Sequence, residues 1–118
     1  MKNLIMALVF LSAFNSTVFA HGAADSKAQI KQCLTEGILA KAVFQDYRNG
    51  KSEAEIKWDV LNAVRSTNSR LSPEIMERFM EIVERAKKFS SSPAYNADRF
   101  QGYIEGNCVA DVLWEETK

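Results

Sequence analysis

The sequence predicts an all-α protein, a four-helix up-down-up-down bundle tied by one disulfide between its first and last helices. Apolar residues recur at spacings of three and four over most of the chain, as the buried face of a helix requires. Turn signals separate four such stretches, and no strand-like alternation competes with them. The two cysteines lie toward opposite ends of the helical region.

Residues 1–20 have the three zones of a secretory signal peptide. Lys2 gives a basic start, residues 4–14 are apolar, and Val18 and Ala20 are the small residues expected before a cleavage site. The apolar run is about 11 residues long, too short to cross ~30 Å of hydrocarbon. We therefore expect cleavage after Ala20, a single domain over residues 21–118, a periplasmic or secreted location, and no membrane span.

The charge balance argues against a nucleic-acid partner. The chain has 15 basic and 15 acidic residues, and loss of Lys2 with the signal peptide leaves one net negative charge. Binding to a phosphate backbone needs clustered positive charge. We therefore expect no nucleic acid among the partners.

The first helix is expected to run to Arg48 from a cap at Asp25 or Ser26. Gly50 follows its end, where glycine tolerates the left-handed conformation. Residues 38–44 are apolar around much of the helix. This favours a central buried helix over an exposed strip that awaits a partner.

The second helix is expected to start at a capping box formed by Ser52 and Glu55, in which each side chain satisfies a backbone N–H. The polar run 66–69 ends it. Its apolar positions share one face and are Ile56, Val60, Leu61 and Val64.

The third helix has the clearest start, since Ser72 can cap it and Pro73 suits its first position. One core stripe is expected, formed by Ile75, Phe79, Ile82, Ala86 and Phe89. The opposite face carries acid-before-base pairs at i,i+4, which are Glu74 with Arg78, Glu81 with Arg85, and Glu84 with Lys88. These carboxylates are interpreted as a solvated face, not as a catalytic acid/base pair.

The fourth helix is expected after a cap at Asn96, with Phe100, Ile104, Cys108 and Val112 at intervals of four. Cys33 lies about seven residues after the start of the first helix, and Cys108 about seven before the end of the fourth, or roughly 10 Å from each end. In the expected topology these helices are antiparallel neighbours, so the two cysteines lie at one level.

A disulfide between Cys33 and Cys108 is the favoured state of the two cysteines, since an exported protein meets an oxidising environment. It would close a loop of about 76 residues, for which chain entropy gives roughly 4.5 kcal/mol. Two free thiols or a metal site are the alternatives, and the lack of a supporting histidine disfavours the metal.

The residues give no catalytic set, so we expect no enzyme, no cofactor and no catalytic residue. No histidine in the middle of the chain can activate a serine or a thiol. The single histidine, His21, would become the mature N-terminus, where amine and imidazole could chelate copper. Such sites need a further histidine, so no metal is expected. The paired carboxylates, Glu53 with Glu55 and Glu115 with Glu116, fit a helix cap and a chain end.

Three residues are candidates for a partner surface. Trp58 lies about 135° from the apolar face of the second helix, and a partly exposed tryptophan is typical of interface anchors. Packing of its ring against a loop explains this position equally well. Gly102 and Gly106 each cost the fourth helix about 1 kcal/mol relative to alanine. They could admit the third helix or a partner closely, or could mark a soft helix.

Four features of the chain resemble those of small exported proteobacterial proteins of unknown function. They are the signal peptide, Cys33, the sequence Arg48-Asn49-Gly50 at the end of the first helix, and the segment from Phe100 to Cys108. The resemblance implies a helical periplasmic protein with one disulfide, and it transfers no functional residue. The architecture is also similar to periplasmic immunity proteins that neutralise cell-wall-cleaving toxins, and to acid-stress chaperones.

We therefore expect a non-enzymatic periplasmic protein that acts by protein–protein binding, either immunity- or inhibitor-like or chaperone-like. The alternative is a periplasmic binder of a small ligand or metal, which would use a cavity between helices or the terminal amine with His21. A weak hydrolase that uses carboxylates alone is a third class.

Overall fold

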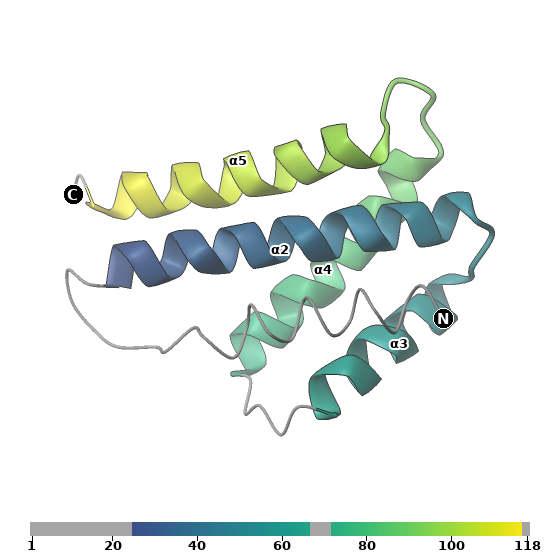
Figure 1. Cartoon of the computed structure of the whole chain (residues 1–118), viewed down its shortest axis with the longest axis horizontal. Coiled ribbons are helices and arrows are strands. Elements are labelled where there is room, and N and C mark those ends of the chain that lie inside the picture. The colour runs from purple at the N-terminus through teal and green to yellow at the C-terminus, as the bar shows by residue number, and fades with distance from the viewer. Residues whose placement is uncertain (1–24, 67–71, 117–118) are drawn as a thin grey trace.

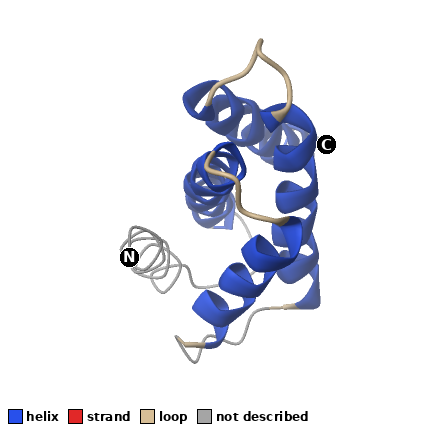
Figure 2. Cartoon of the chain, turned by 90° about the vertical axis from the view of Figure 1, so that its right-hand side faces the viewer, coloured by secondary structure: helices blue, strands red, loops and turns tan. Residues whose placement is uncertain are grey.

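Four helices make up the part of the chain that the structure describes, residues 25–66 and 72–116 of a computed structural model. They are α2 (Asp25–Arg48), α3 (Glu53–Arg65), α4 (Pro73–Ser90) and α5 (Ala97–Glu116) (Figure 1). No strand occurs among these residues (Figure 2). The expected signal peptide and His21 lie outside the described residues.

Side-chain caps start three of the helices at the expected residues. The oxygens of Ser52, Ser72 and Asn96 accept hydrogen bonds from backbone N–H groups three residues further on, at 3.2, 3.3 and 2.8 Å. Each cap satisfies a donor that the first turn of a helix leaves without a partner. At the first cap, the Ser52 hydroxyl also donates to the carboxylate of Glu55 at 3.2 Å.

The turn after α2 depends on Gly50 and Arg48. Gly50 has a φ of 91°, a conformation that favours glycine, and it follows the end of α2 as expected. The Arg48 guanidinium lies over the Phe44 ring, 4.9 Å from its centroid. Its Nη2 donates to the carbonyls of Ser92 and Tyr95 at 3.0 and 2.8 Å, so Arg48 fastens the α4–α5 connection to the end of α2.

The helix α2 is the central element of an up-down-up-down bundle. It lies antiparallel beside α5 along most of its length, and α4 crosses it obliquely (Figure 1). The shorter α3 packs mainly on α4, contacts α2 only slightly and does not contact α5. The expectation that the apolar stretch 38–44 forms a central buried helix is confirmed by the burial of Leu39, Ala40, Val43 and Phe44.

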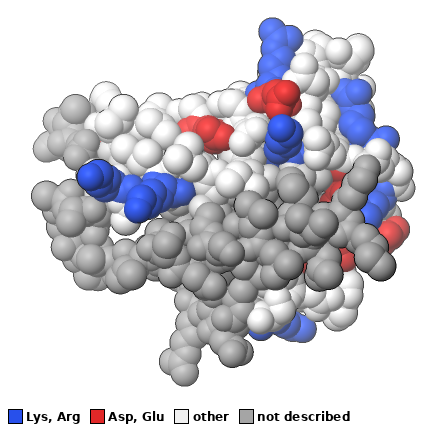
Figure 3. Space-filling model, in the orientation of Figure 1, with Lys and Arg blue, Asp and Glu red and all other residues white. Residues whose placement is uncertain are grey.

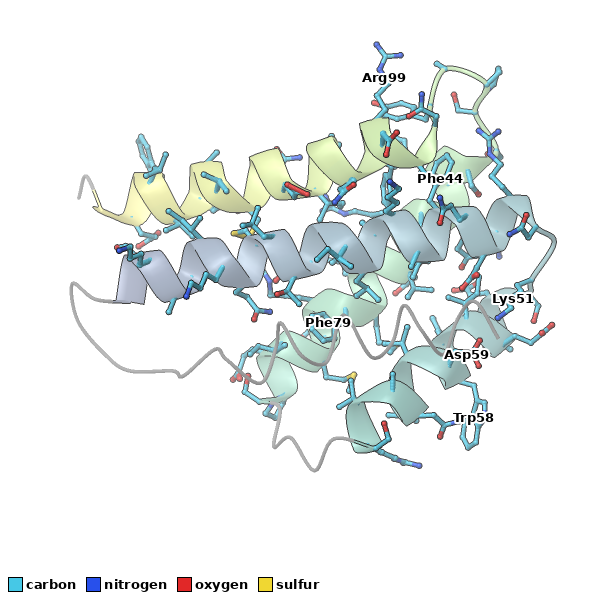
Figure 4. The ribbon with its side chains drawn as sticks, viewed as in Figure 1. Phe44, Lys51, Trp58, Asp59, Phe79 and Arg99 are labelled. Carbon is cyan, nitrogen blue, oxygen red and sulfur yellow. A yellow bond between two sulfur atoms is a disulfide. The ribbon has the colours of Figure 1, made fainter. Side chains whose placement is uncertain are left out.

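The core joins all four helices. Phe44 of α2 and Phe79 of α4 are almost wholly buried and point into the bundle (Figure 4). Burial of a side chain of this size contributes about 2–3 kcal/mol. The core residues are Leu39, Ala40, Val43, Phe44, Ile56, Val60, Val64, Ile75, Phe79, Ile82, Val83, Ala86, Phe100 and Ile104.

The disulfide between Cys33 and Cys108 ties α2 to α5, as predicted. The two Cα atoms lie 5.4 Å apart. Cys33 is eight residues from the start of α2 and Cys108 is eight residues from the end of α5, so the antiparallel pair brings them to one level. The bridge therefore fixes the register of the two helices that share the longest contact.

Candidate functional site

An apolar groove lies between α3 and α4, with a volume of about 350 Å³. Its lining comprises Ala54, Lys57, Trp58 and Leu61 of α3 with Met76 and Met80 of α4, and we call it the α3–α4 groove. Trp58 is 56% exposed and points away from the body of the molecule (Figure 4). Exposed tryptophan and methionine side chains are typical of protein-binding surfaces.

The groove follows from the helical phase of α3. The face formed by Ile56, Val60 and Val64 is buried in the core, which turns Trp58 outward. Among the described helices α3 contacts only α4 and, slightly, α2, and Trp58 is left more than half exposed at the edge of the groove.

One ion pair, between Glu53 and Lys87, joins α3 to α4 beside the groove, and two more pairs lie within or next to α3. The Glu53 carboxylate lies 3.0 Å from Nζ of Lys87 and 3.1 Å from Nζ of Lys57. The hydrogen bonds from Lys87 and then Lys57 lower the pKa of Glu53. Lys51 and Asp59 form another pair at 2.9 Å near the start of α3 (Figure 4).

The structure does not bring the three predicted partner-surface residues together. Trp58 lies in the α3–α4 groove, whereas Gly102 and Gly106 are exposed on α5, which α3 does not contact. A Cβ built at either glycine would meet no atom within 4 Å. Close approach of α4 therefore does not depend on these glycines, and their place on a partner surface stays a prediction.

The glycine on which a close contact does depend is Gly37, which the sequence interpretation missed. Gly37 is buried on α2, and a Cβ there would overlap the side chain of Glu105 on α5. The signal that could have found it is its place in the middle of a long apolar helix. Glycine weakens a helix at such a position, so its presence there indicates that packing requires a small residue.

A second, polar cavity lies beside the disulfide, between α4 and α5 with one residue of α2. Its volume is about 170 Å³. We call it the disulfide cavity, and its lining comprises Glu36, Arg78, Glu81, Ile82, Arg85, Ile104, Asn107, Cys108 and Asp111.

A buried carboxylate forms the inner wall of the disulfide cavity. The Glu36 side chain is 3% exposed, and its two oxygens accept hydrogen bonds from Nε and Nη2 of Arg78 at 2.8 and 2.9 Å. The sequence predicted that Arg78 would pair with Glu74, and this is wrong, because the oblique crossing of α4 over α2 brings Glu36 within its reach. The expected pair of Glu81 with Arg85 is confirmed, at 3.3 Å.

The guanidinium of Arg78 also reaches the disulfide. Its Nη2 lies 3.3 Å from Sγ of Cys108. The hydrogen bonds to Glu36 raise the pKa of Arg78, so its positive charge persists across the whole accessible pH range. Nε2 of Gln32, one turn earlier on α2, donates to the same carboxylate at 3.4 Å, while the buried Oε1 of Gln32 has no partner within the described chain.

Neither the charged side chains visible on one face nor the metal-ligating groups indicate a further site within the part of the chain that the structure describes. Basic and acidic side chains are interspersed on the visible part of the face in Figure 3. Across residues 25–66 and 72–116, no three histidine, cysteine or acidic side chains are grouped to hold a metal ion. The same residues include no helix that is long and apolar enough to cross a membrane.

Comparisons of the chain with protein-family models, with curated proteins and with solved structures give no match.

Proposed function

We propose that this chain is a non-enzymatic exported protein that acts in the periplasm by binding another protein through the α3–α4 groove. The observation that carries the proposal is the exposure of Trp58 at the edge of an apolar groove with two methionines, Met76 and Met80. An indole that is more than half exposed beside apolar neighbours gains contact area when a partner covers it. The signal-peptide pattern of residues 1–20 and the disulfide support the compartment.

Two kinds of binding protein fit the groove. An immunity- or inhibitor-like protein would bind one defined partner with Trp58 as an anchor. A chaperone-like protein would bind many partly unfolded chains, for which flexible methionines are well suited. The expected architecture is similar to that of periplasmic immunity proteins and of acid-stress chaperones, which supports both kinds.

Photo-crosslinking in periplasm tests the proposal and separates the two kinds. A photoreactive phenylalanine analogue replaces Trp58 in one variant and Leu34 in the control. Leu34 is 47% exposed on α2 and is not part of the groove lining. One dominant crosslinked protein at position 58 supports the immunity- or inhibitor-like function, and a broad set supports the chaperone-like one.

The outcome against the proposal is crosslinking at position 58 that does not exceed crosslinking at position 34. With a purified partner, Trp58→Ala is expected to weaken binding by a factor of about 30, the loss of a hot spot worth about 2 kcal/mol. Calorimetry measures this factor directly.

The disulfide cavity favours the second candidate function, a small-ligand binder. Its volume of about 170 Å³ is below that of pockets for drug-sized molecules, so a ligand would contain few atoms. A screen of small polar metabolites by thermal shift tests this candidate. The copper alternative at His21 is tested by calorimetric titration of the protein cleaved after Ala20, where the lack of a tight site would remove it.

A further inference from the structure

One sulfur of the disulfide faces a cavity that is open to solvent. Cys33 is fully buried, whereas Cys108 keeps 6% of its surface exposed and lines the disulfide cavity. A small molecule that enters the cavity therefore meets Cys108 before Cys33. A volume of about 170 Å³ admits a thiol of a few heavy atoms.

Arg78 is held in place to act on this sulfur. Two hydrogen bonds to Glu36 fix its guanidinium, and its Nη2 lies 3.3 Å from Cys108 Sγ. A cationic donor beside a sulfur stabilises the thiolate form of that sulfur, so Arg78 assists the step in which Cys108 is the leaving group. The carboxylate of Glu36 offsets part of the charge of Arg78, but the N–H group remains directed at the sulfur.

The charged groups around the cavity select among thiols. Three acidic side chains, Glu36, Glu81 and Asp111, and two basic ones, Arg78 and Arg85, line it. Their sum is one negative charge, so an anionic thiol is disfavoured relative to an uncharged or cationic one.

We propose that the Cys33–Cys108 pair is a thiol-exchange site, at which a small uncharged or cationic thiol attacks Cys108 through the disulfide cavity. The incoming thiolate forms a bond to Cys108 Sγ as the Cys33–Cys108 bond breaks. The electron pair leaves on Cys33 Sγ. The incoming thiol has released its proton to the solvent in the disulfide cavity, and the Cys33 thiolate takes up a proton from there once the bridge has opened.

A second small thiolate completes the reduction. It attacks the small-molecule sulfur of the mixed disulfide, and Cys108 leaves as a thiolate that accepts the hydrogen bond of Arg78. Two small thiols are thereby oxidised to one disulfide, and the protein gains two electrons and two protons as two thiols. The reaction removes the covalent bond between α2 and α5. The redox state of the compartment therefore determines whether these two helices are covalently linked.

Mass spectrometry of the oxidised full chain tests the order of attack. The protein is mixed with cysteamine, mercaptoethanol or mercaptoethanesulfonate, quenched with acid, and mapped by peptide. We expect the first adduct on Cys108. Relative to an unstructured disulfide peptide, cysteamine and mercaptoethanol should react several times faster than the sulfonate. A first adduct on Cys33, or equal reaction of the three thiols, would overturn the proposal.

Two arginine variants separate the hydrogen bond from the charge of the cavity. Arg78→Gln and Arg85→Gln each remove one positive charge from the lining, but only Arg78 touches the sulfur. Arg78→Gln should slow release of Cys108 from its mixed disulfide about tenfold more than Arg85→Gln does. Equal slowing in the two variants counts against the proposed role of Arg78.

A measurement on the unaltered protein keeps the proposal testable if Arg78→Gln does not fold. The exchange rate is followed in urea concentrations below the unfolding transition. Exchange through the cavity predicts a rate that is nearly independent of urea. A rate that rises with urea in parallel with unfolding would show that only the unfolded chain reacts, and would overturn the proposal.

Discussion

Arg78 of α4 reaches across the bundle to the buried carboxylate of Glu36 on α2, and its Nε and Nη2 donate to the two oxygens at 2.8 and 2.9 Å. The Glu36 side chain is 3% exposed and that of Arg78 is 46% exposed. The pair therefore joins a buried anion to a half-exposed cation, and the anion depends on its partner far more than the cation does.

Arg78→Ala is expected to lower the free energy of unfolding by about 2–3 kcal/mol, because it leaves the Glu36 carboxylate buried without its cation. Urea denaturation measures the loss. Arg85→Ala is the matched control, since Arg85 forms an exposed i,i+4 pair with Glu81 and should cost less than about 1 kcal/mol. Equal losses in both variants would contradict a special role for Arg78. Glu36→Met combined with Arg78→Met should cost less than Arg78→Ala alone.

The partner of Arg78 shows where sequence reasoning ends. The spacing of Glu74 and Arg78 predicted a contact within one helix. Spacing along the sequence indicates which side chains are neighbours within a helix, but not which residues of another helix they meet. The contact with Glu36 depends on the angle at which α4 crosses α2. That angle results from packing of the whole core and is not encoded in the spacing within either helix.

Local signals predicted the helices well because their physical causes are local. Ser52, Ser72 and Asn96 cap the next turn with their own side chains, and Gly50 needs only its own backbone freedom. For the candidate site the prediction was partial. Helical phase predicted the exposure of Trp58, but its groove neighbours Met76 and Met80 lie on α4 and follow from the contact between α3 and α4.

Removal of the disulfide is expected to lower the free energy of unfolding by about 4.5 kcal/mol. Cys33 and Cys108 are 75 residues apart in sequence, and the bridge restricts the unfolded chain over this long loop. Urea denaturation of the protein with Cys33→Ala and Cys108→Ala, compared with the oxidised protein, measures the difference. The urea midpoint should fall while helical circular dichroism persists in buffer, since α2 and α5 also pack through Phe44 and Phe100. A loss below about 1 kcal/mol would contradict the loop-closure estimate.

Alkaline pH is expected to destabilise the protein through Tyr47. Burial, with the nearby carboxylates of Glu53 and Glu84, raises the pKa of Tyr47 to about 12. In the unfolded chain a tyrosine ionises near pH 10, about two units earlier. Between these values the unfolded state has lost the proton and the folded state keeps it, so stability falls as the pH rises from about 10 to about 12.

Tyr47→Phe should reduce this fall. At neutral pH, Tyr47→Phe should cost no stability, because the buried hydroxyl of Tyr47 has no hydrogen-bond partner among the described residues. Urea denaturation at pH 7, 10 and 11.5 measures both proteins. The same alkaline fall in the Tyr47→Phe protein and the unaltered one would contradict the assignment.

The three helical glycines should respond in different ways to alanine. Gly102→Ala and Gly106→Ala are each expected to raise the free energy of unfolding by about 1 kcal/mol, since the new Cβ meets no atom and the helix propensity improves. The free energy of unfolding of the Gly37→Ala protein should be at least about 1 kcal/mol below that of the Gly102→Ala protein, because the Glu105 side chain occupies the space of the new Cβ. Thermal and urea denaturation of the three single variants give the comparison.

The same alanine substitutions in a Glu105→Ala protein show whether the contact with Glu105 causes the difference in stability between Gly37→Ala and Gly102→Ala. Without the longer side chain, the new Cβ at position 37 has room, so Gly37→Ala and Gly102→Ala should then change stability by similar amounts. A difference that persists in this background would place the cause in the α2 backbone instead of the packing of α2 on α5. No contact within the described chain requires Gly102 or Gly106. If they belong to a partner surface, alanine at either position should weaken the complex while it stabilises the protein alone.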